Sequence, residues 1–99
     1  MVEKILREIV VKFNERAKTD PKLKEELTGF ERAVLIRLDD GQEFSFRVSG
    51  SQAVDFQDRG ISNPDITIKT DPETIEKLAR RELRIMKAIA TRKLKIDAG

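Results

Sequence analysis

Apolar residues recur every three or four positions at the start of the chain, which predicts an amphipathic helix over residues 2–17. Its apolar positions are Val2, Ile5, Leu6, Ile9, Val10, Phe13 and Ala17. The polar side carries both signs of charge, whereas a membrane-surface helix is basic there, so we expect this helix to pack on a core. Asp20-Pro21 predicts a second, short helix over residues 20–27, because Asp caps backbone amides and the fixed φ of Pro suits the first turn.

The middle of the chain alternates between apolar and polar residues, which predicts strands. Residues 32–38 and 42–49 flank Asp40-Gly41, a dipeptide that favours a type I′ hairpin turn. Shorter strands are predicted at 53–57, 66–69 and 93–96. The residues expected on one apolar face are Val34, Ile36, Leu38, Phe44, Phe46, Val48, Val54, Phe56, Ile66, Ile68, Leu94 and Ile96. Glu43, Ser45 and Arg47 point the other way, so the sheet has one wet and one dry side.

Residues 73–90 show a helical apolar face that Glu82 interrupts. That face consists of Ile75, Leu78, Leu83, Ile85, Met86, Ile89 and Ala90. Because a buried, unpaired carboxylate costs several kcal/mol, we predict a break near Arg81-Glu82, with helices at 73–81 and 83–90 and Glu82 in the first turn of the second. The alternative is a buried acid with a raised pKa. Together these elements predict one α+β domain over residues 1–99, with a five-stranded, mainly antiparallel sheet covered on one face by helices.

Composition excludes several kinds of chemistry. The chain has no Cys, His, Trp or Tyr, so disulfides, thiol or imidazole catalysis and the common zinc sites are excluded. Asp39-Asp40 fits a turn better than a metal pair, and Ser49-Gly50-Ser51 lacks the spacing of a phosphate-binding loop. We therefore expect no catalytic residue, no metal and no cofactor, and thus no enzyme. Neither a signal peptide nor a transmembrane segment is predicted, which favours a cytoplasmic protein.

Basic side chains are concentrated in the last quarter of the sequence. Those expected opposite the apolar face are Lys77, Arg80, Arg81, Arg84 and Lys87, and Arg92, Lys93 and Lys95 follow along the chain. This basic face is either plainly solvated, or attractive to lipid head groups and acidic ligands, or a nucleic-acid site. No aromatic residue interleaves with it and the net charge is only +2, so nucleic acid is not expected as a partner.

Three segments within residues 30–97 resemble the sterol carrier (nonspecific lipid-transfer) family. They are the strand Pro64-Asp65-Ile66-Thr67-Ile68, the helix containing Leu83, Met86 and Ala88, and the last strand Lys93-Leu94-Lys95-Ile96. Arg81 stands at the corner where the family usually has Gly. The resemblance implies non-catalytic binding of a fatty acid, acyl-CoA or sterol-like lipid in an apolar tunnel between sheet and helices. The implied lipid-binding residues are Phe44, Phe46, Val54, Phe56, Ile66, Ile68, Ile75, Leu83, Met86 and Ile89, each of which could instead be ordinary core.

The family normally continues beyond the last strand into a helix that covers the tunnel, whereas this sequence stops at Asp97-Ala98-Gly99. From the resemblance we therefore expect a second copy to cover the apolar surface, as a homodimer, with the first helix as the competing cover. An alternative function, from another class, is a non-binding protein-interaction module whose filled core leaves it to dimerise or to dock onto a partner enzyme.

Overall fold

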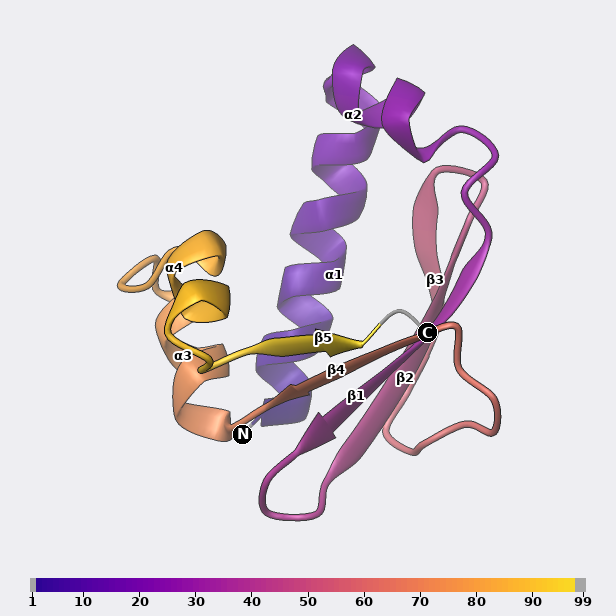
Figure 1. Cartoon of the computed structure of the whole chain (residues 1–99). Helices are drawn as coiled ribbons and strands as arrows, with labels where there is room; N and C mark the ends of the chain where they lie inside the picture. Colours follow the sequence, from indigo (N-terminus) through magenta and orange to yellow (C-terminus); the bar gives the residue numbers. More distant parts are fainter. Residues whose placement is uncertain (1, 98–99) are drawn as a thin grey trace.

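The computed structural model describes residues 2–97, and the side chains of Ile85 and Met86 lie outside that description. Helices and strands follow one another along the chain as Figure 1 shows. The elements are α1 (Val2–Thr19), α2 (Pro21–Leu27), β1 (Arg32–Leu38), β2 (Glu43–Ser49), β3 (Gln52–Gln57), β4 (Ile66–Thr70), α3 (Pro72–Ala79), α4 (Ile85–Ala90) and β5 (Lys95–Asp97).

The strands form one sheet in the order β3-β2-β1-β4-β5. Three of the neighbouring pairs are antiparallel and the fourth, β1 with β4, is parallel. The α+β prediction with a five-stranded, mainly antiparallel sheet is therefore confirmed, and the sheet is mixed. The parallel pair arises because residues 58–65 carry the chain back along the sheet before β4 begins beside β1.

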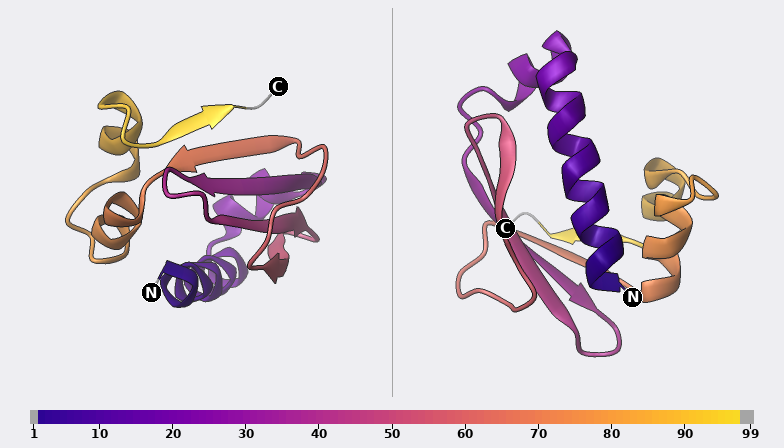
Figure 2. Two further views of the ribbon diagram at one scale, coloured as in Figure 1. Left: turned by 90° about the horizontal axis from the view of Figure 1, so that it is seen from below. Right: turned by 180° about the vertical axis from the view of Figure 1, so that it is seen from behind.

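Helix α1 lies across one face of the sheet and packs against β3, α2 and α3. Figure 2 shows α1 near the β3 edge, with β5 at the opposite edge and α3 and α4 beside the end of β4. The apolar stripe predicted for the first helix thus faces the sheet. The buried cluster between these layers contains Val2, Leu6, Ile36, Leu38, Phe44 and Ile75.

The first hairpin forms where Asp40-Gly41 predicts it, but the type I′ turn is wrong. Gly41 has a φ of 94°, whereas the φ of Asp40 is not positive. The Gly41 amide donates to the Leu38 carbonyl at 3.1 Å, and the Leu38 amide donates to Gln42 at 2.9 Å. These bonds define a three-residue loop over residues 39–41, in which a turn is followed by a glycine bulge and only one residue is left-handed.

Strand β3 contains an irregularity that moves Val54 to the face opposite the helices. Val48 pairs with Ala53 and Arg47 pairs with Val54, and the register shifts between Ser45 and Arg47. Asp55, with a φ of 56°, supplies the extra residue of the bulge. The prediction that Val54 lies on the apolar face is wrong, because strict alternation from Phe56 does not hold across a bulge.

The face of the sheet away from the helices is partly covered by the loop at residues 58–65. Ser45 points to this face as predicted but is buried there, and its hydroxyl donates to the Arg59 carbonyl at 2.8 Å. Leu35 is buried on the same side. A side chain at Gly60 would collide with the Glu43 carboxylate, which would have to swing aside, and would touch Leu35.

Both Asp-Pro motifs begin helices, as the sequence predicts. Asp20 accepts hydrogen bonds from the amides of Lys22 and Leu23 at the start of α2. Asp71 accepts from the Thr74 amide at the start of α3. Each proline occupies the first turn, where its missing amide costs no hydrogen bond.

The predicted helix break is confirmed, because α3 ends at Ala79 and α4 begins at Ile85. Arg81 adopts the left-handed conformation with a φ of 61°. Glu82 is exposed in the connection rather than in the first turn of α4. Both expectations for Glu82, a position in the helix and a buried acid, are therefore wrong, since solvation in the connection suffices to stabilise the charge.

Candidate functional site

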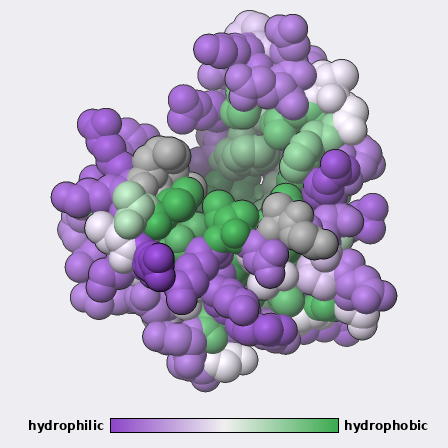
Figure 3. All heavy atoms as spheres, in the orientation of Figure 1, coloured by the Kyte–Doolittle hydropathy of each residue, from purple (hydrophilic) through white to green (hydrophobic). Residues whose placement is uncertain are grey.

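An apolar cavity of about 370 Å³ lies between α1, the sheet and α3. Figure 3 shows it as a hollow with apolar walls that opens on the face turned toward the viewer in Figure 1. Because α1 packs on the β3 side, the sheet nearer β5 is left without a helix over it. The cavity is the space that results.

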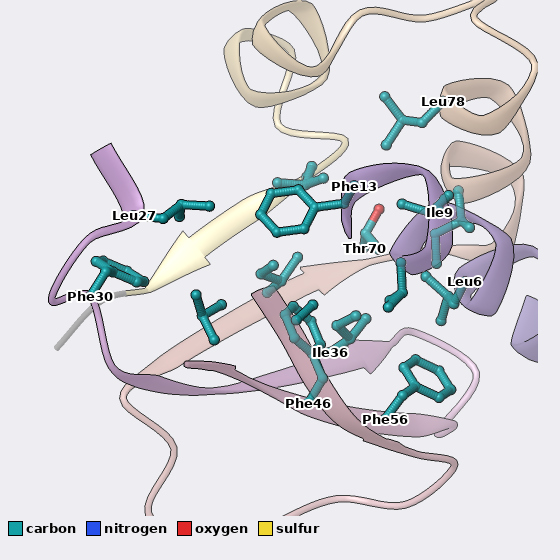
Figure 4. Close-up of a pocket in the computed structure, with 16 residues that line it drawn as sticks. Leu6, Ile9, Phe13, Leu27, Phe30, Ile36, Phe46, Phe56, Thr70 and Leu78 are labelled. Atoms are coloured by element: carbon teal, nitrogen blue, oxygen red, sulfur yellow. The ribbon is translucent and has the colours of Figure 1, made fainter. Parts of the chain in front are cut away.

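Side chains from most elements converge on this cavity, as Figure 4 shows. Helix α1 and the α2 region form one wall, the strands form the floor, and α3 closes one end. The lining residues are Leu6, Ile9, Val10, Phe13, Leu27, Phe30, Ile36, Phe46, Val48, Ala53, Phe56, Ile68, Thr70, Ile75, Leu78 and Leu94.

Fifteen of these sixteen lining residues are apolar, and Thr70 is the exception. The Thr70 hydroxyl donates to the Lys93 carbonyl at 2.8 Å, so its proton is already used within the protein. None of the described residues contributes a charged side chain to the lining. Such a surface recognises a ligand by shape and apolar area, with little directional hydrogen bonding.

The structure brings four of the ten residues implied as lipid-binding to the cavity, namely Phe46, Phe56, Ile68 and Ile75. Phe44 lies in the buried cluster and stacks on Phe56 with ring centroids 6.0 Å apart. Ile66 is half-buried outside the lining, and Val54 is on the far face. Leu83 lines a separate, partly polar hollow beside α3 and α4, Ile89 is exposed, and the Met86 side chain lies outside the described residues.

The largest group that the sequence reasoning left out comes from α1. Leu6, Ile9, Val10 and Phe13 line the cavity, and their helical spacing was visible in the sequence. That spacing shows which side of the helix faces inward, but it does not show whether that side meets packed core or open space. Leu27 and Phe30 carried no periodic signal, because they lie at the end of α2 and in the loop that follows.

Polar clusters suited to metal binding or catalysis are a second kind of candidate site. Within the described residues, no group of three or more carboxylate, His or Cys side chains is arranged to hold a metal ion. Asp40 of the hairpin has its pKa lowered chiefly by the hydrogen bond from the Gln42 amide, and further by the Gln42 side chain. That carboxylate therefore stabilises the hairpin turn by accepting these hydrogen bonds. No helix within residues 2–97 is long and apolar enough to cross a bilayer.

A protein-family match covers most of the chain. Residues 12–97 match the model described as the SCP-2 sterol transfer family. The chain belongs to the SCP-2 sterol transfer family. The resemblance noted in the sequence is confirmed, and the family match extends it into α1, which supplies part of the cavity wall. No curated protein matches the chain significantly.

Solved structures show the same fold at low sequence identity. The UbiJ-SCP2 ubiquinone synthesis protein is 16% identical with a TM-score of 0.67, covering 94% of this chain and 81% of that one. Palmitated SCP2L2 from Aedes aegypti is 13% identical with a TM-score of 0.62, covering 92% and 80%. The sec-alkylsulfatase Pisa1 from Pseudomonas sp. is 18% identical with a TM-score of 0.58 over 76% of this chain, which spans only 12% of that enzyme.

Proposed function

We propose that this chain binds a hydrophobic lipid, such as a fatty acid, acyl-CoA or sterol-like molecule, in the cavity between α1 and the sheet, and carries it without chemical change. The observation that carries this proposal is the lining itself, in which the one polar side chain already has its hydrogen-bond partner within the protein. Membership of the SCP-2 sterol transfer family supports the same class of ligand.

An energetic argument favours an occupied cavity. A closed, dry void of about 370 Å³ would cost about 9 kcal/mol at roughly 24 cal/mol per Å³. That is comparable to the whole stability of a domain, about 5–15 kcal/mol. Water entering through the open side finds almost no polar partner, and buried waters need about two to four. An apolar ligand removes both costs because it replaces water on this surface.

The filled-core interaction module is less well supported, because it requires a packed interior where the described residues leave an open cavity. Neither the family match nor the similar solved structures support the expected homodimer, and lipid binding does not require it.

The first test identifies the natural ligand. Protein purified without detergent, extracted into organic solvent and analysed by mass spectrometry should release lipid in a near one-to-one ratio. The neighbour from Aedes aegypti is described as palmitated, so fatty acyl species are the first to seek. Extracts without stoichiometric lipid, together with no uptake of added fatty acid, would contradict lipid binding.

The second test places the ligand with two matched variants on β4. Ile68 lines the cavity, whereas Ile66, two residues earlier on the same face, does not. We expect Ile68→Trp to fill the cavity and reduce binding of a fluorescent fatty acid at least tenfold with little change in melting temperature. We expect Ile66→Trp to retain binding and cost roughly 1–3 kcal/mol by overpacking. Equal effects of both variants on binding would argue against this cavity as the site.

A chain-length series then measures the depth of the cavity. Each buried methylene contributes about 0.8 kcal/mol, so Kd should fall about fourfold for every carbon added to a saturated fatty acid. The gain should stop once the cavity is full, and Ile68→Trp should move that plateau to shorter chains. A Kd independent of chain length would mean that the ligand is held by its head group.

A further inference from the structure

Charge is distributed unevenly along the chain. Residues 80–97 contain seven of its twenty basic side chains but only two of its eighteen carboxylates, Glu82 and Asp97, so residues 1–79 retain thirteen basic and sixteen acidic side chains. A small excess of +2 for the whole chain therefore hides a strongly basic C-terminal segment and a mildly acidic remainder. This segment comprises α4, the connections on either side of it and β5.

Most of these basic side chains are exposed and have no ionic partner among the residues that the structure describes. Arg80 pairs with Glu76 at 3.3 Å. The other six are Arg81, Arg84, Lys87, Arg92, Lys93 and Lys95, all exposed, and no ion pair within the described residues 2–97 involves them. Stabilisation of the fold by ion pairing thus does not explain them, and their charge remains available to an external anionic partner.

The same segment exposes large apolar side chains beside the cavity. Ile96 is 50% exposed and Ile89 is 36% exposed, and among the described residues only Val11 of α1 joins them as an exposed large apolar side chain. Ile96 pairs with Ile68, whose side chain lines the cavity, so Ile96 lies on the cavity side of the edge strand. Leu94, which also lines the cavity, stands between the exposed Lys93 and Lys95.

We propose that α4, the turn after it and β5 form a docking surface for an anionic lipid membrane, with Ile96 entering the interface and the basic side chains contacting the head groups. Figures 1 and 3 show β5 and the mouth of the hollow on the same face of the molecule. This docking rests on the proposed function, because it is useful only if the cavity binds a lipid. It would bring the open side of the cavity to the bilayer from which that lipid would enter.

Other anionic or apolar partners fit this surface less well. A nucleic acid would meet no aromatic side chain between residues 80 and 97, and phosphates offer nothing to the exposed isoleucines. A second copy of the chain in a symmetric contact would bring the same basic segment against itself, and like charges repel. A bilayer with anionic head groups satisfies the basic and the apolar parts together.

Two triple variants with the same change in net charge test the electrostatic part. Arg84→Gln/Lys87→Gln/Lys93→Gln removes three charges from the docking surface. Lys4→Gln/Lys12→Gln/Arg47→Gln removes three exposed charges from α1 and from the face of the sheet away from the helices. A basic residue at an anionic membrane contributes about fivefold to partitioning, so the first variant should bind phosphatidylserine vesicles roughly 100-fold more weakly than the parent. The second should lose less than about tenfold, since its charges lie farther from the membrane.

Two single tryptophan variants test the orientation, because the chain has no natural Trp. Ile96→Trp places the reporter on the docking surface, and Val11→Trp places it at a similarly exposed position, 55%, on α1. Figure 2 shows α1 toward the viewer when the molecule is seen from behind. On phosphatidylserine vesicles with brominated acyl chains, we expect blue-shifted and quenched emission from Ile96→Trp and unchanged emission from Val11→Trp.

Several results would overturn this docking surface: equal loss of vesicle binding in both triple variants, equal binding to zwitterionic vesicles, or quenching of Val11→Trp in place of Ile96→Trp. Binding of an RNA oligomer that competes with the vesicles while the emission of Ile96→Trp stays unshifted would also overturn it. Binding of a fluorescent fatty acid in vesicle-free solution is measured separately on every variant. If the parent protein does not bind the fatty acid, the proposed function alone is contradicted. If the parent protein binds the fatty acid but not the vesicles, docking alone is contradicted.

Discussion

Asn14 holds α1 onto the edge strand β3 through two hydrogen bonds to one residue. Its side-chain Nδ2 donates to the Ala53 carbonyl at 2.9 Å, and its Oδ1 accepts from the Ala53 amide at 2.7 Å. Strand β3 is at the edge of the sheet, where backbone groups lack a further strand as partner. The Asn14 amide thus supplies the donor and acceptor that a neighbouring strand would have supplied.

Replacing Asn14 by Ala should destabilise the protein by about 2 kcal/mol. Each hydrogen bond contributes about 1 kcal/mol net, and a backbone group left unsatisfied in a buried place costs about 1–3 kcal/mol. Ala53 is buried, so at least part of that cost applies. The better helix propensity of Ala offsets roughly 0.5 kcal/mol. Against a typical total of about 5–15 kcal/mol, such a loss is easily measured.

Urea unfolding followed by circular dichroism measures the loss, because the chain has no Trp for fluorescence. Lys12→Ala is the matched control, since Lys12 is exposed on the same helix and should change stability by less than about 0.5 kcal/mol. Amide exchange of Ala53, followed by NMR, reports on the contact itself. A slow Ala53 amide in Asn14→Ala, with a stability loss equal to the control's, would refute this role for Asn14.

Two further predictions concern the α3–α4 corner and the first hairpin. Arg81→Gly should stabilise the protein by roughly 0.5–1 kcal/mol because it relieves the left-handed conformation of Arg81, whereas Lys87→Gly inside α4 should destabilise it by a similar amount in the same unfolding assay. NMR titration of the Asp40 carboxyl should give a pKa below its ordinary value of 3.8, and Gln42→Ala should raise it only part-way, since the backbone amide is the larger cause. Because that pKa is lower in the folded state, the stabilisation is complete above the unfolded pKa and is lost as the pH falls through the folded value. A pKa that does not respond to Gln42→Ala, or an Arg81→Gly variant less stable than the parent, would contradict these predictions.

The sequence predicted the elements well because each has a local cause. Asp20 and Asp71 cap helices through their own side chains, and the break before Glu82 follows from the cost of burying a charge. Such causes act within a few residues, so they are visible in the sequence. The parallel pairing of β1 with β4 has no such signal, because it depends on how residues 58–65 cross the sheet.

The candidate site was harder to predict, because a cavity is defined by what does not pack. Phe44 and Phe46 are two residues apart on β2, so both point to the same face of the sheet. Phe46 nevertheless lines the cavity, whereas Phe44 is buried against Phe56. Their difference depends on where α1 crosses the sheet. Likewise, a bulge at Asp55 places Val54 on the face away from the helices. Such a bulge often contains Gly, and without a Gly at that position the sequence contains no signal for it.

The position of α1 connects stability to the proposed function. Packing against β3 and α3 keeps α1 at one side of the sheet, and the Asn14–Ala53 contact fixes that position by hydrogen bonds that apolar packing alone would not specify. Without this contact, apolar collapse favours a shift of α1 over the uncovered strands, since burial of apolar area is non-directional. The cavity would then shrink. Asn14→Ala should therefore weaken binding of a fluorescent fatty acid even at temperatures where the variant is fully folded, and unchanged affinity there would mean that packing alone keeps the cavity open.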